Sequence, residues 1–469
     1  MDGHECSEVL LSELDFSNRL DAEYYQKVYL QYKEKIENIK HSRMDCLADF
    51  LIGPFGSAYD TSNYVDSTEY RYVRGQDIKP FELQSTSAKY MSKEDYDRLI
   101  RYALKPGDIL ISVVGTIGNV CIVRDKDVPG IFSCKSTVVR TKNINPYYLI
   151  CYLNSKYGQG LLQRQERGAI QKGLNLDDLK IIPVPEFSNT LYTLFETLLS
   201  NVEFLQDKFC KLFESAEELL MKELGFDTTV IPKDNVSIKN LSESLEDTGR
   251  LDAEYYKRDN YKVIDMINAE GTIKTLCNIY DKTFKPNDNE YYRYIELANI
   301  GKAGEIEDVD IIIGEELPSR ARRLVKRGNV IVPSVEGSLE SCAIITKSYD
   351  NALCSTGFYV IDSEYYNSET LLVLLKSKPI QMLLKRGCSG TILTNITKEE
   401  FLDIPLPDVS VEIQKVIKEK VAIAYELRDK CKELLESAKS AVEMAIERDE
   451  TSATSWLKDK MERLIKEQL

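Results

Sequence analysis

One seven-residue string occurs twice in this chain. Arg-Leu-Asp-Ala-Glu-Tyr-Tyr at Arg19–Tyr25 recurs unchanged at Arg250–Tyr256, 231 positions further on. Other strings recur in the same order at offsets of 221 and 222, Leu104–Ile111 with Val325–Val332 and Ile182–Pro185 with Ile404–Pro407. Ordered internal repetition indicates a duplicated architecture. The 469 residues therefore predict two copies of one unit, with a loop shortened in the second copy.

Each copy is predicted to begin with a short helix, near residues 17–39 and again near residues 247–268, because apolar residues recur there at helical spacing. A mixed region of about 140 residues follows, which is the usual size of one domain. In the first copy, strand-like runs at 108–114 and 119–123 flank a glycine-containing turn. Runs at 329–335 and 342–346 are the counterparts in the second copy.

Each mixed region is predicted to end in a capped helix start. Asn175 has Asp178 three residues on, and Thr397 has Glu400 at the same spacing. A side-chain cap followed by an acidic residue in the first turn is typical of a helix N-terminus.

A long helix follows each mixed region. Its apolar residues alternate spacings of three and four, the seam of a coiled coil: Leu198, Val202, Leu205, Phe209, Leu212, Ala216 and Leu219 in the first copy, and Leu427, Cys431, Leu434, Ala438 and Ala441 in the second. Because each seam needs a partner and the other copy supplies one, the two helices are predicted to pair. The alanines would allow a close approach.

The acidity of the chain is unevenly distributed. Lys and Arg number 61 and Asp and Glu 76, for a net charge of −15. Residues 45–180 carry 18 basic and 16 acidic side chains, and residues 272–408 carry 16 basic and 20 acidic side chains. The remaining net charge of −13 therefore lies on the helices and termini. Basic clusters precede the matched strands, with Arg101 and Lys105 answered by Arg322 and Lys326. This placement favours a phosphate-facing edge on each mixed region.

The residue pattern offers no catalytic constellation. The only histidines are His4 and His41, so a His-dependent site in each half cannot be built, and the eleven cysteines include no CxxC pair. Phosphate-loop and dinucleotide-loop spacings are also missing. No signal pattern or run of about 20 apolar residues is seen, so a cytoplasmic binding protein without membrane or metal is expected.

At this point the residues resemble a known family, the specificity (S) subunits of type I DNA restriction-modification enzymes. Besides the duplicated string and the closing Ile-Pro-x-Pro pairs, the resemblance rests on Gly53–Ser57, Leu104–Val123, Gln171–Asn175, Tyr294–Ile300 and Ser319–Arg323. It covers nearly the whole chain, and the repeated order makes it specific.

The resemblance implies an α+β fold: two mixed α/β target recognition domains related by internal duplication and separated by long helices that form an antiparallel coiled coil. The expected division is a helical segment at 1–44, recognition domain 1 at 45–186, a helical spacer at 187–271, recognition domain 2 at 272–409 and a helical spacer at 410–469.

The resemblance also implies a function. Such a subunit is not an enzyme: each recognition domain reads one half of a split sequence in double-stranded DNA, and the helices dock two methyltransferase subunits. No cofactor is expected in this chain, since S-adenosylmethionine would bind the methyltransferase. A further subunit would carry restriction and translocation. Two alternatives stay open, a recognition subunit of another methylation-based defence enzyme and a coiled-coil interaction protein without DNA binding.

Polar and basic side chains on loops are the candidate DNA contacts. They are Arg71, Arg74, Gln76, Arg98, Arg101, Thr116, Asn119, Lys135 and Arg167 in domain 1, and Arg293, Arg320, Arg322, Arg323, Ser338, Ser355, Arg386 and Thr391 in domain 2. With one extra residue allowed at Pro333, Glu336 aligns with Val114. A glutamate there would repel phosphate but accept a bond from a cytosine amino group, so the two domains are expected to read different half-sites.

Overall fold

A computed structural model describes the chain at residues 7–10, 14, 19–55, 58–84, 88–168, 172–226, 236–246, 249–301, 303–307, 309–390 and 394–466. The chain divides into two compact units. Unit 1 comprises the residues up to 205 and from 429 onward, and unit 2 comprises residues 206–428. The boundaries fall inside two long helices, α7 (Asn189–Glu223) and α14 (Val411–Glu447). The five predicted segments stay predictions.

Unit 1 contains a four-stranded antiparallel sheet in the order β2 (Ala48–Ile52), β8 (Ser136–Thr141), β5 (Ile109–Ser112), β6 (Val120–Ile122). A second sheet has the order β4 (Lys89–Tyr90), β3 (Arg71–Val73), β7 (Gly130–Phe132), in which β3 and β7 run parallel. A short antiparallel pair joins β1 (His41–Arg43) to β9 (Pro183–Pro185).

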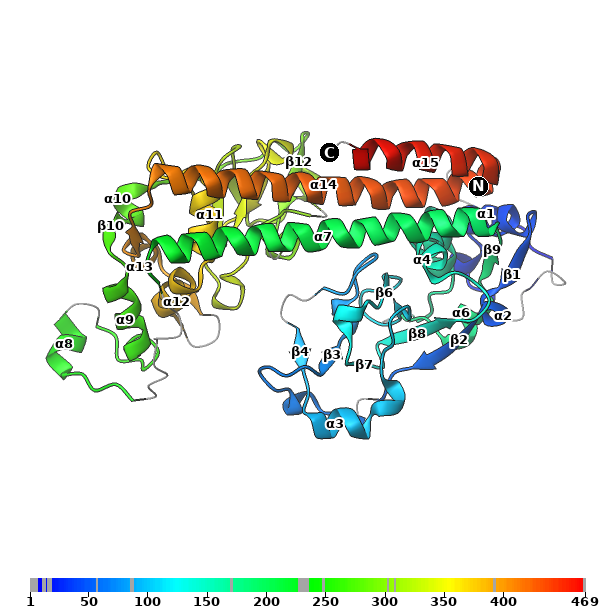
Figure 1. Cartoon of the computed structure of the whole chain (residues 1–469), viewed down its shortest axis with the longest axis horizontal. Helices are drawn as coiled ribbons and strands as arrows, with labels where there is room; N and C mark the ends of the chain where they lie inside the picture. The colour runs from blue at the N-terminus through cyan, green and yellow to red at the C-terminus, as the bar shows by residue number, and fades with distance from the viewer. Residues whose placement is uncertain are drawn as a thin grey trace. The chain divides into compact units, whose positions relative to one another are not determined.

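Unit 1 also contains shorter helices, one of which lies along α14 (Figure 1). Those of unit 1, apart from the two long ones, are α1 (Lys27–Glu37), α2 (Met44–Leu47), α3 (Lys93–Arg98), α4 (Pro146–Asn154), α5 (Lys156–Arg164), α6 (Leu176–Lys180) and α15 (Glu450–Lys466). Short 3-10 turns are η2 (Ala22–Tyr25), η4 (Thr61–Asn63), η5 (Gly75–Asp77), η6 (Ile100–Tyr102) and η7 (Asp125–Asp127).

Unit 2 repeats this topology. Its four-stranded sheet has the order β11 (Asn278–Ile279), β18 (Phe358–Asp362), β15 (Val330–Pro333), β16 (Ala343–Ile344). Its second sheet has the order β13 (Asp310–Ile313), β12 (Tyr291–Ile295), β17 (Leu353–Ser355), β14 (Ala321–Leu324), with one strand more than in unit 1. The pair β12–β17 is parallel, as is β3–β7 in unit 1. Antiparallel pairs join β10 (Ala269–Thr272) to β21 (Pro405–Pro407) and β19 (Cys388–Ser389) to β20 (Asn395–Ile396).

The shorter helices of unit 2 are α8 (Leu241–Glu246), α9 (Arg258–Met266), α10 (Ile273–Leu276), α11 (Ser368–Lys376), α12 (Lys378–Gly387) and α13 (Lys398–Leu402). Its 3-10 turns are η9 (Leu297–Asn299), η10 (Gly314–Glu316), η11 (Glu336–Ser338) and η12 (Lys347–Tyr349). The mixed helix and strand content and the doubled strand order confirm the predicted fold class.

The central strands form because their sequences are largely apolar. All four residues of β5 and all four of β15 are buried, as expected for strands covered on both faces. The predicted pairing of β5 with β6 is present, with Ile109 opposite Ile122. Gly115 and Gly118 in the connecting turn have φ of +89° and +84°, values that glycine adopts without strain.

The predicted coiled coil is also present, with α7 and α14 side by side and antiparallel in each unit (Figure 1). In unit 1, Cys431 Sγ contacts the Val202 carbonyl at 3.7 Å. In unit 2, Lys420 Nζ donates to Ser215 Oγ at 2.9 Å, and Ser410 Oγ donates to Glu223 at 2.9 Å. Residue numbers therefore rise along one helix as they fall along the other.

The predicted seam holds along α14 but drifts along α7. All five predicted seam residues of α14 are buried. On α7, Leu212 and Leu219 are only half-buried, and Phe213 and Leu220 are buried beside them. A straight helix advances 3.6 residues per turn, so a strict seven-residue repeat drifts off the contact line over several turns.

Two local predictions were wrong. The repeated string does not start a helix: α1 begins at Lys27 and α9 at Arg258, and the string before them is irregular or a single 3-10 turn. In this string, the side chains of Arg19 and Arg250 bond to backbone carbonyls far along the chain, so contacts outside the string determine its conformation. Asn175 precedes α6 but makes no side-chain cap bond, whereas Thr397 accepts from the Glu400 amide at 3.3 Å as predicted.

Candidate nucleic-acid interface

In unit 1, three loops meet at one end of the four-stranded sheet. Thr116, in the turn between β5 and β6, donates through Oγ1 to the Gly75 carbonyl at 3.4 Å. Gly75 also lies against Lys135, since a β-carbon built on this glycine would approach the Lys135 β-carbon to 3.2 Å. We name Gly75, Gln76, Gly115, Thr116 and Lys135 the first loop surface.

The first loop surface presents polar groups to solvent. Gln76, Thr116 and Lys135 are exposed. An amide, a hydroxyl and an ammonium are groups that can read base edges or hold phosphates. Asn119, also a predicted contact, is half-buried and donates to the Ile78 carbonyl at 3.0 Å, so its amide helps to fix the turn.

Three predicted arginines of unit 1 have carboxylate partners. Arg71 is buried on β3 with Nη1 3.1 Å from Asp127. Arg74 pairs at 2.7 Å with the carboxylate three residues further on. Arg167 makes two bonds of 2.6 Å to Asp178, and this hydrogen bonding raises the pKa of the guanidinium. Each has a structural partner, and its contact with DNA stays a prediction.

Arg98 and Arg101 lie on a different segment, formed by α3 and η6. Arg98 is exposed, donates to the Ala58 carbonyl at 2.7 Å and pairs with Asp95 at 2.6 Å. The guanidinium of Arg101 lies 4.5 Å from the centre of the Tyr102 ring. The partners of Arg98 and Arg101 in these contacts all lie outside the first loop surface.

The strand register of unit 2 corrects one sequence alignment. Pro333 pairs with Phe358 between β15 and β18, just as Ser112 pairs with Ser136 between β5 and β8. Pro333 is therefore the counterpart of Ser112 and not an extra residue. Every following residue of the turn is displaced by one position from the predicted alignment.

Glu336 consequently stands where unit 1 has Gly115. A residue with a side chain disfavours the φ of +89° that Gly115 adopts, and the turn in unit 2 takes another form, the 3-10 turn η11. The Glu336 carboxylate accepts a hydrogen bond from Thr394 Oγ1 and lies 3.7 Å from Lys385 Nζ.

The end of the second sheet thus carries different chemistry. We name Ala298, Glu336, Gly337 and Gly357 the second loop surface, because they are the counterparts of Gln76, Gly115, Thr116 and Lys135. The exposed amide, hydroxyl and ammonium of unit 1 are absent at these four positions, and a carboxylate stands in place of a glycine.

Several predicted contacts of unit 2 lie near this surface. Ser355 is buried, and its Oγ accepts from the Gly357 amide at 3.2 Å. Arg320 is exposed, and its guanidinium pairs with Glu296 at 2.9 Å. Its backbone carbonyl accepts a hydrogen bond from the backbone amide of Thr356, the residue after Ser355. Ser338 lies half-buried on η11.

The other arginines of unit 2 lie on its second sheet. Arg293 is exposed on β12, and Arg322 and Arg323 are half-buried on β14. In the described part of the chain, Arg323 Nε and Nη1 are buried without a hydrogen-bond partner. Thr391 lies outside the described residues, as do Gly56, Ser57 and Gln171 of the strings quoted above.

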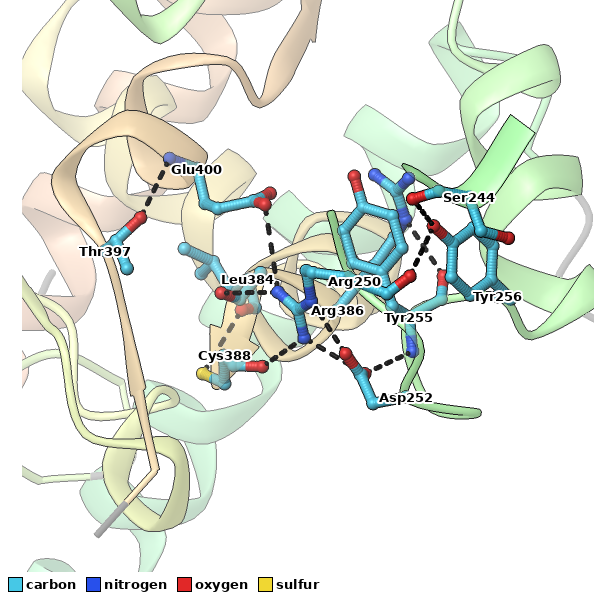
Figure 2. Close-up of polar contacts among 11 residues, drawn as sticks. Ser244, Arg250, Asp252, Tyr255, Tyr256, Leu384, Arg386, Cys388, Thr397 and Glu400 are labelled. Atoms are coloured by element: carbon cyan, nitrogen blue, oxygen red, sulfur yellow. Dashed lines mark hydrogen bonds and ion pairs between the residues drawn. The ribbon is translucent and has the colours of Figure 1, made fainter. Parts of the chain in front are cut away.

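Arg386 belongs to a clasp around a tyrosine ring (Figure 2). Its guanidinium lies 3.9 Å from the centre of the Tyr255 ring, and that of Arg250 lies 4.4 Å from it. Arg386 Nε also donates to the Tyr255 carbonyl at 3.2 Å. Arg250 donates to Asp252 at 2.8 Å and to the Cys388 carbonyl at 2.7 Å. Arg386 thus has a structural role, and its contact with DNA stays a prediction.

Unit 1 contains the same clasp. Arg19 and Arg164 lie 4.5 Å and 3.9 Å from the centre of the Tyr24 ring. Arg19 donates to Asp21 and to the Glu166 carbonyl, and the bond from Arg19 lowers the pKa of the Asp21 carboxyl. Each cation–π contact contributes from about 0.5 kcal/mol when exposed to about 2 kcal/mol when desolvated.

Sequence reasoning found the repeated string but missed its purpose in the fold. Arg164 was not among the predicted DNA contacts, and Arg386 was assigned to DNA because it lies in a basic cluster of the sequence. A signal was present: Arg164 and Arg386 are 222 residues apart, the offset of the other matched pairs.

A cleft of about 500 Å³ lies beside the clasp of unit 2, lined by Arg250, Tyr255, Leu383, Arg386, Ser389, Thr397, Glu399, Glu400, Asp403, Ile404 and Pro405. Burial raises the pKa of Glu400, against the opposing effect of Arg250, which lies 3.7 Å away. Within the described residues, no group of three or more His, Cys, Asp or Glu side chains is arranged to hold a metal ion.

Comparison with known proteins gives a partial sequence match. No family model matches the chain. The chain is 31% identical over 116 residues to the "Type I restriction enzyme EcoBI specificity subunit" of Escherichia coli. The matched segment spans 24% of this chain and 24% of the relative.

Solved structures of specificity subunits are also similar in part. The S subunit of a type I restriction-modification system from M. genitalium has a TM-score of 0.37 and 14% identity, covering 87% of this chain and 94% of that one. The HsdS subunit from Thermoanaerobacter tengcongensis has a TM-score of 0.23 and 15% identity, covering 91% and 96%.

The duplicated topology and the paired long helices define a chain built from two similar units, each with a loop surface at the same end of its four-stranded sheet. Over 116 residues, the sequence of the chain is similar to that of a type I restriction-modification specificity subunit. None of the helices in the described part of the chain combines the length and apolar character needed to span a bilayer.

Proposed function

We propose that the chain is the non-catalytic DNA sequence-recognition subunit of a type I restriction-modification complex. Recognition domain 1 (45–186) and recognition domain 2 (272–409) each read one half of a bipartite target in double-stranded DNA. The first and second loop surfaces are the proposed reading edges. The sequence relative supports the assignment to the type I class.

One observation supports the proposal of two different half-sites: the same end of the four-stranded sheet has different side-chain groups in the two units. Lys135 and Thr116 of the first surface have Gly357 and Gly337 as counterparts, and Glu336 replaces a glycine. An ammonium favours phosphate and guanine acceptors, whereas a carboxylate accepts from a cytosine amino group. Two copies of one scaffold with different reading groups support two different half-sites.

The long helices fit a spacing and docking role. A helix of 35 residues such as α7 is about 50 Å long, which is comparable to one to one and a half turns of duplex DNA. Two methyltransferase subunits would dock through the helices and bind S-adenosylmethionine, and a further subunit would supply restriction and translocation. The complex would work in the cytoplasm, where its DNA substrate lies.

Deletion of this chain tests the proposal. The neighbouring methyltransferase gene would be expressed with and without the chain, and genomic adenine methylation would be mapped by sequencing. We expect methylation at a split motif only when the chain is present. Methylation that is unchanged without the chain would contradict the proposal. If the chain bound a partner and the resulting complex had no affinity for DNA, a coiled-coil interaction protein would be favoured instead.

A further inference from the structure

Two residues outside the set of predicted DNA contacts hold the carboxylate of Glu336. Thr394 bonds to this residue twice: its carbonyl accepts from the Glu336 amide at 3.0 Å, and its Oγ1 donates to Glu336 Oε2 at 2.5 Å. Lys385 Nζ lies 3.7 Å from the other carboxylate oxygen, Oε1. We name Glu336, Lys385 and Thr394 the glutamate triad. Its members come from three separate parts of the sequence.

The backbone around the glutamate triad is fixed by strand-like pairing. Val335 forms an isolated antiparallel bridge with Asn395, the residue after Thr394. A backbone hydrogen bond of 2.8 Å on the next pair of residues extends this pairing. Lys385 comes from the last turn of α12. The carboxylate is therefore held in one orientation before any ligand arrives, which lowers the entropy cost of binding.

The three triad positions are occupied by other residues in unit 1. The isolated bridges at the two turns match Thr394 with Lys172, and the order of residues in the two clasps matches Lys385 with Gln163. Since Glu336 itself stands where unit 1 has a glycine, all three positions differ together. Residues that change as a set are expected when they serve one task.

Both units contain a lysine–glutamate pair here, but only unit 2 has its carboxylate on the turn. In unit 1, Lys172 Nζ lies 3.0 Å from Glu166, which belongs to the segment after α5. In unit 2, the paired carboxylate is that of Glu336, on the second loop surface. Each pair is neutral in sum. The second unit thus places a negative group on the proposed reading edge together with a positive one that compensates it.

Compensation is needed because a carboxylate beside DNA is repelled by the phosphates. The Lys385 side chain is 60% exposed, whereas that of Glu336 is 33% exposed. The exposed ammonium can turn from Glu336 to a phosphate as DNA binds, and the Thr394 hydroxyl keeps the carboxylate in place. Phosphate contacts fix the orientation of a protein on the duplex, and base contacts supply the sequence preference.

The free lone pairs of Glu336 favour one base in the major groove. An ionised carboxylate only accepts hydrogen bonds, and it has about four lone-pair sites, more than the triad contacts occupy. Cytosine presents an amino donor there. Adenine has the acceptor N7 beside its amino group, and guanine and thymine present acceptors. An acceptor that faces a carboxylate is unfavourable, so a C·G pair fits the triad.

We propose that Thr394 and Lys385 are positioning residues for Glu336, and that the glutamate triad makes recognition domain 2 select a C·G pair at one position of its half-site. The inference rests on the proposed function and deepens it. Glu336 touches the base, Thr394 aims the carboxylate, and Lys385 offsets its charge. Recognition domain 1 has glycine, lysine and glutamine at the matching positions, so this C·G requirement belongs to one half-site.

Glu336→Gln is the direct test, because a glutamine side chain both donates and accepts and pairs with N6 and N7 of adenine. The purified complete complex would be titrated by fluorescence anisotropy with duplexes in which each base pair of both half-sites is replaced in turn. The wild type should prefer C·G at one position by at least about fivefold. The variant should lose this preference or transfer it to A·T, in the half-site that Thr116→Ala leaves unchanged.

Variants of the two positioning residues separate aiming from folding. Thr394→Val should lower the C·G preference, and Thr394→Ser, which keeps the hydroxyl, should restore it. Lys385→Ala should weaken binding to every duplex and lower its salt dependence by about one ion, with the base preference unchanged. Gln163→Ala, at the exposed position that matches Lys385 in unit 1, is the control and should change neither half-site. A purely structural role would lower affinity for every duplex alike.

A Glu336→Gln complex with the wild-type preference at every position would overturn the inference. So would an equal loss of affinity on all duplexes, or a change confined to the half-site of recognition domain 1. If Glu336→Gln melts below the wild type, the comparison of Thr394→Val with Thr394→Ser decides in its place. These failures are distinguishable from failure of the proposed function, because methylation would still depend on the presence of the chain.

Discussion

At the scale of single residues, an arginine's role is decided by its partners and not by its place in a basic cluster. Arg71 and Arg386 both lie in basic stretches, yet one is buried against Asp127 and the other lies on a tyrosine ring. Position in the chain cannot reveal this, because each partner is more than 50 residues away. Exposure of Gln76 and Lys135 was likewise settled only by the fold.

Arg71→Ala should destabilise unit 1 severely. It would leave Asp127 buried and unpaired, a change that costs about 3–5 kcal/mol. Chemical denaturation followed by circular dichroism measures this cost. Lys93→Ala, which removes an exposed basic side chain on α3, is the control. An Arg71→Ala protein as stable as the wild type would show that the pair is not formed.

Lys135→Ala should leave stability unchanged and weaken DNA binding. Lys135 is exposed, and loss of one phosphate contact lowers the salt dependence of binding by about one ion. Fluorescence anisotropy of the assembled complex across a salt series measures the slope. A slope equal to that of the wild type would remove Lys135 from the proposed reading edge.

The clasps should make stability depend on acidity. Hydrogen bonds from Arg19 and Arg250 lower the pKa of Asp21 and Asp252 below the ordinary 3.8. Their contribution is present above about pH 4 and is lost as the pH falls through the lowered pKa of the folded state. Both carboxylates are partly exposed, so each pair contributes only about 0.5–1 kcal/mol.

Melting temperatures of the wild type and the Asp21→Asn, Asp252→Asn double variant between about pH 6 and pH 3 measure this effect. The variant should melt lower near neutral pH and show a shallower decline in acid. Parallel curves would mean that the two carboxylates do not carry the dependence.

At the scale of elements, the spacing of apolar residues correctly predicted the strands and helices whose formation depends on burial. The paired strands β5 and β6 and the seam of α14 follow directly from apolar spacing. The repeated string was misassigned because its conformation depends on hydrogen bonds to residues 137 and more positions away, which local spacing does not encode. The drift of the seam to Phe213 and Leu220 likewise reflects helix geometry along the whole of α7.

Ala438→Phe should destabilise the helix pair in unit 1. Ala438 is fully buried on α14, and extra volume in a packed seam costs about 1–3 kcal/mol. Thermal unfolding measures this cost, with Ser440→Phe on the exposed face as the control. Equal melting temperatures for the two variants would place Ala438 outside a tight contact.

At the scale of the whole molecule, duplication explains both what was predictable and what was not. The repeated strings disclosed two units of one topology, and the strand orders agree with this. The residues of the two loop surfaces could not be aligned correctly from the sequence. The predicted alignment treated Pro333 as an extra residue and matched Glu336 with Val114, whereas the strand register matches Glu336 with Gly115. Only the strand register resolves such a shift.

The most direct test of two-domain reading is adenine-methylation sequencing of cells that carry the complete complex, with wild-type chain or with Thr116→Ala. We predict a split motif with two different halves, in which the variant changes or relaxes one half and leaves the other intact. A single undivided motif, two identical halves, or a change in both halves would contradict the account.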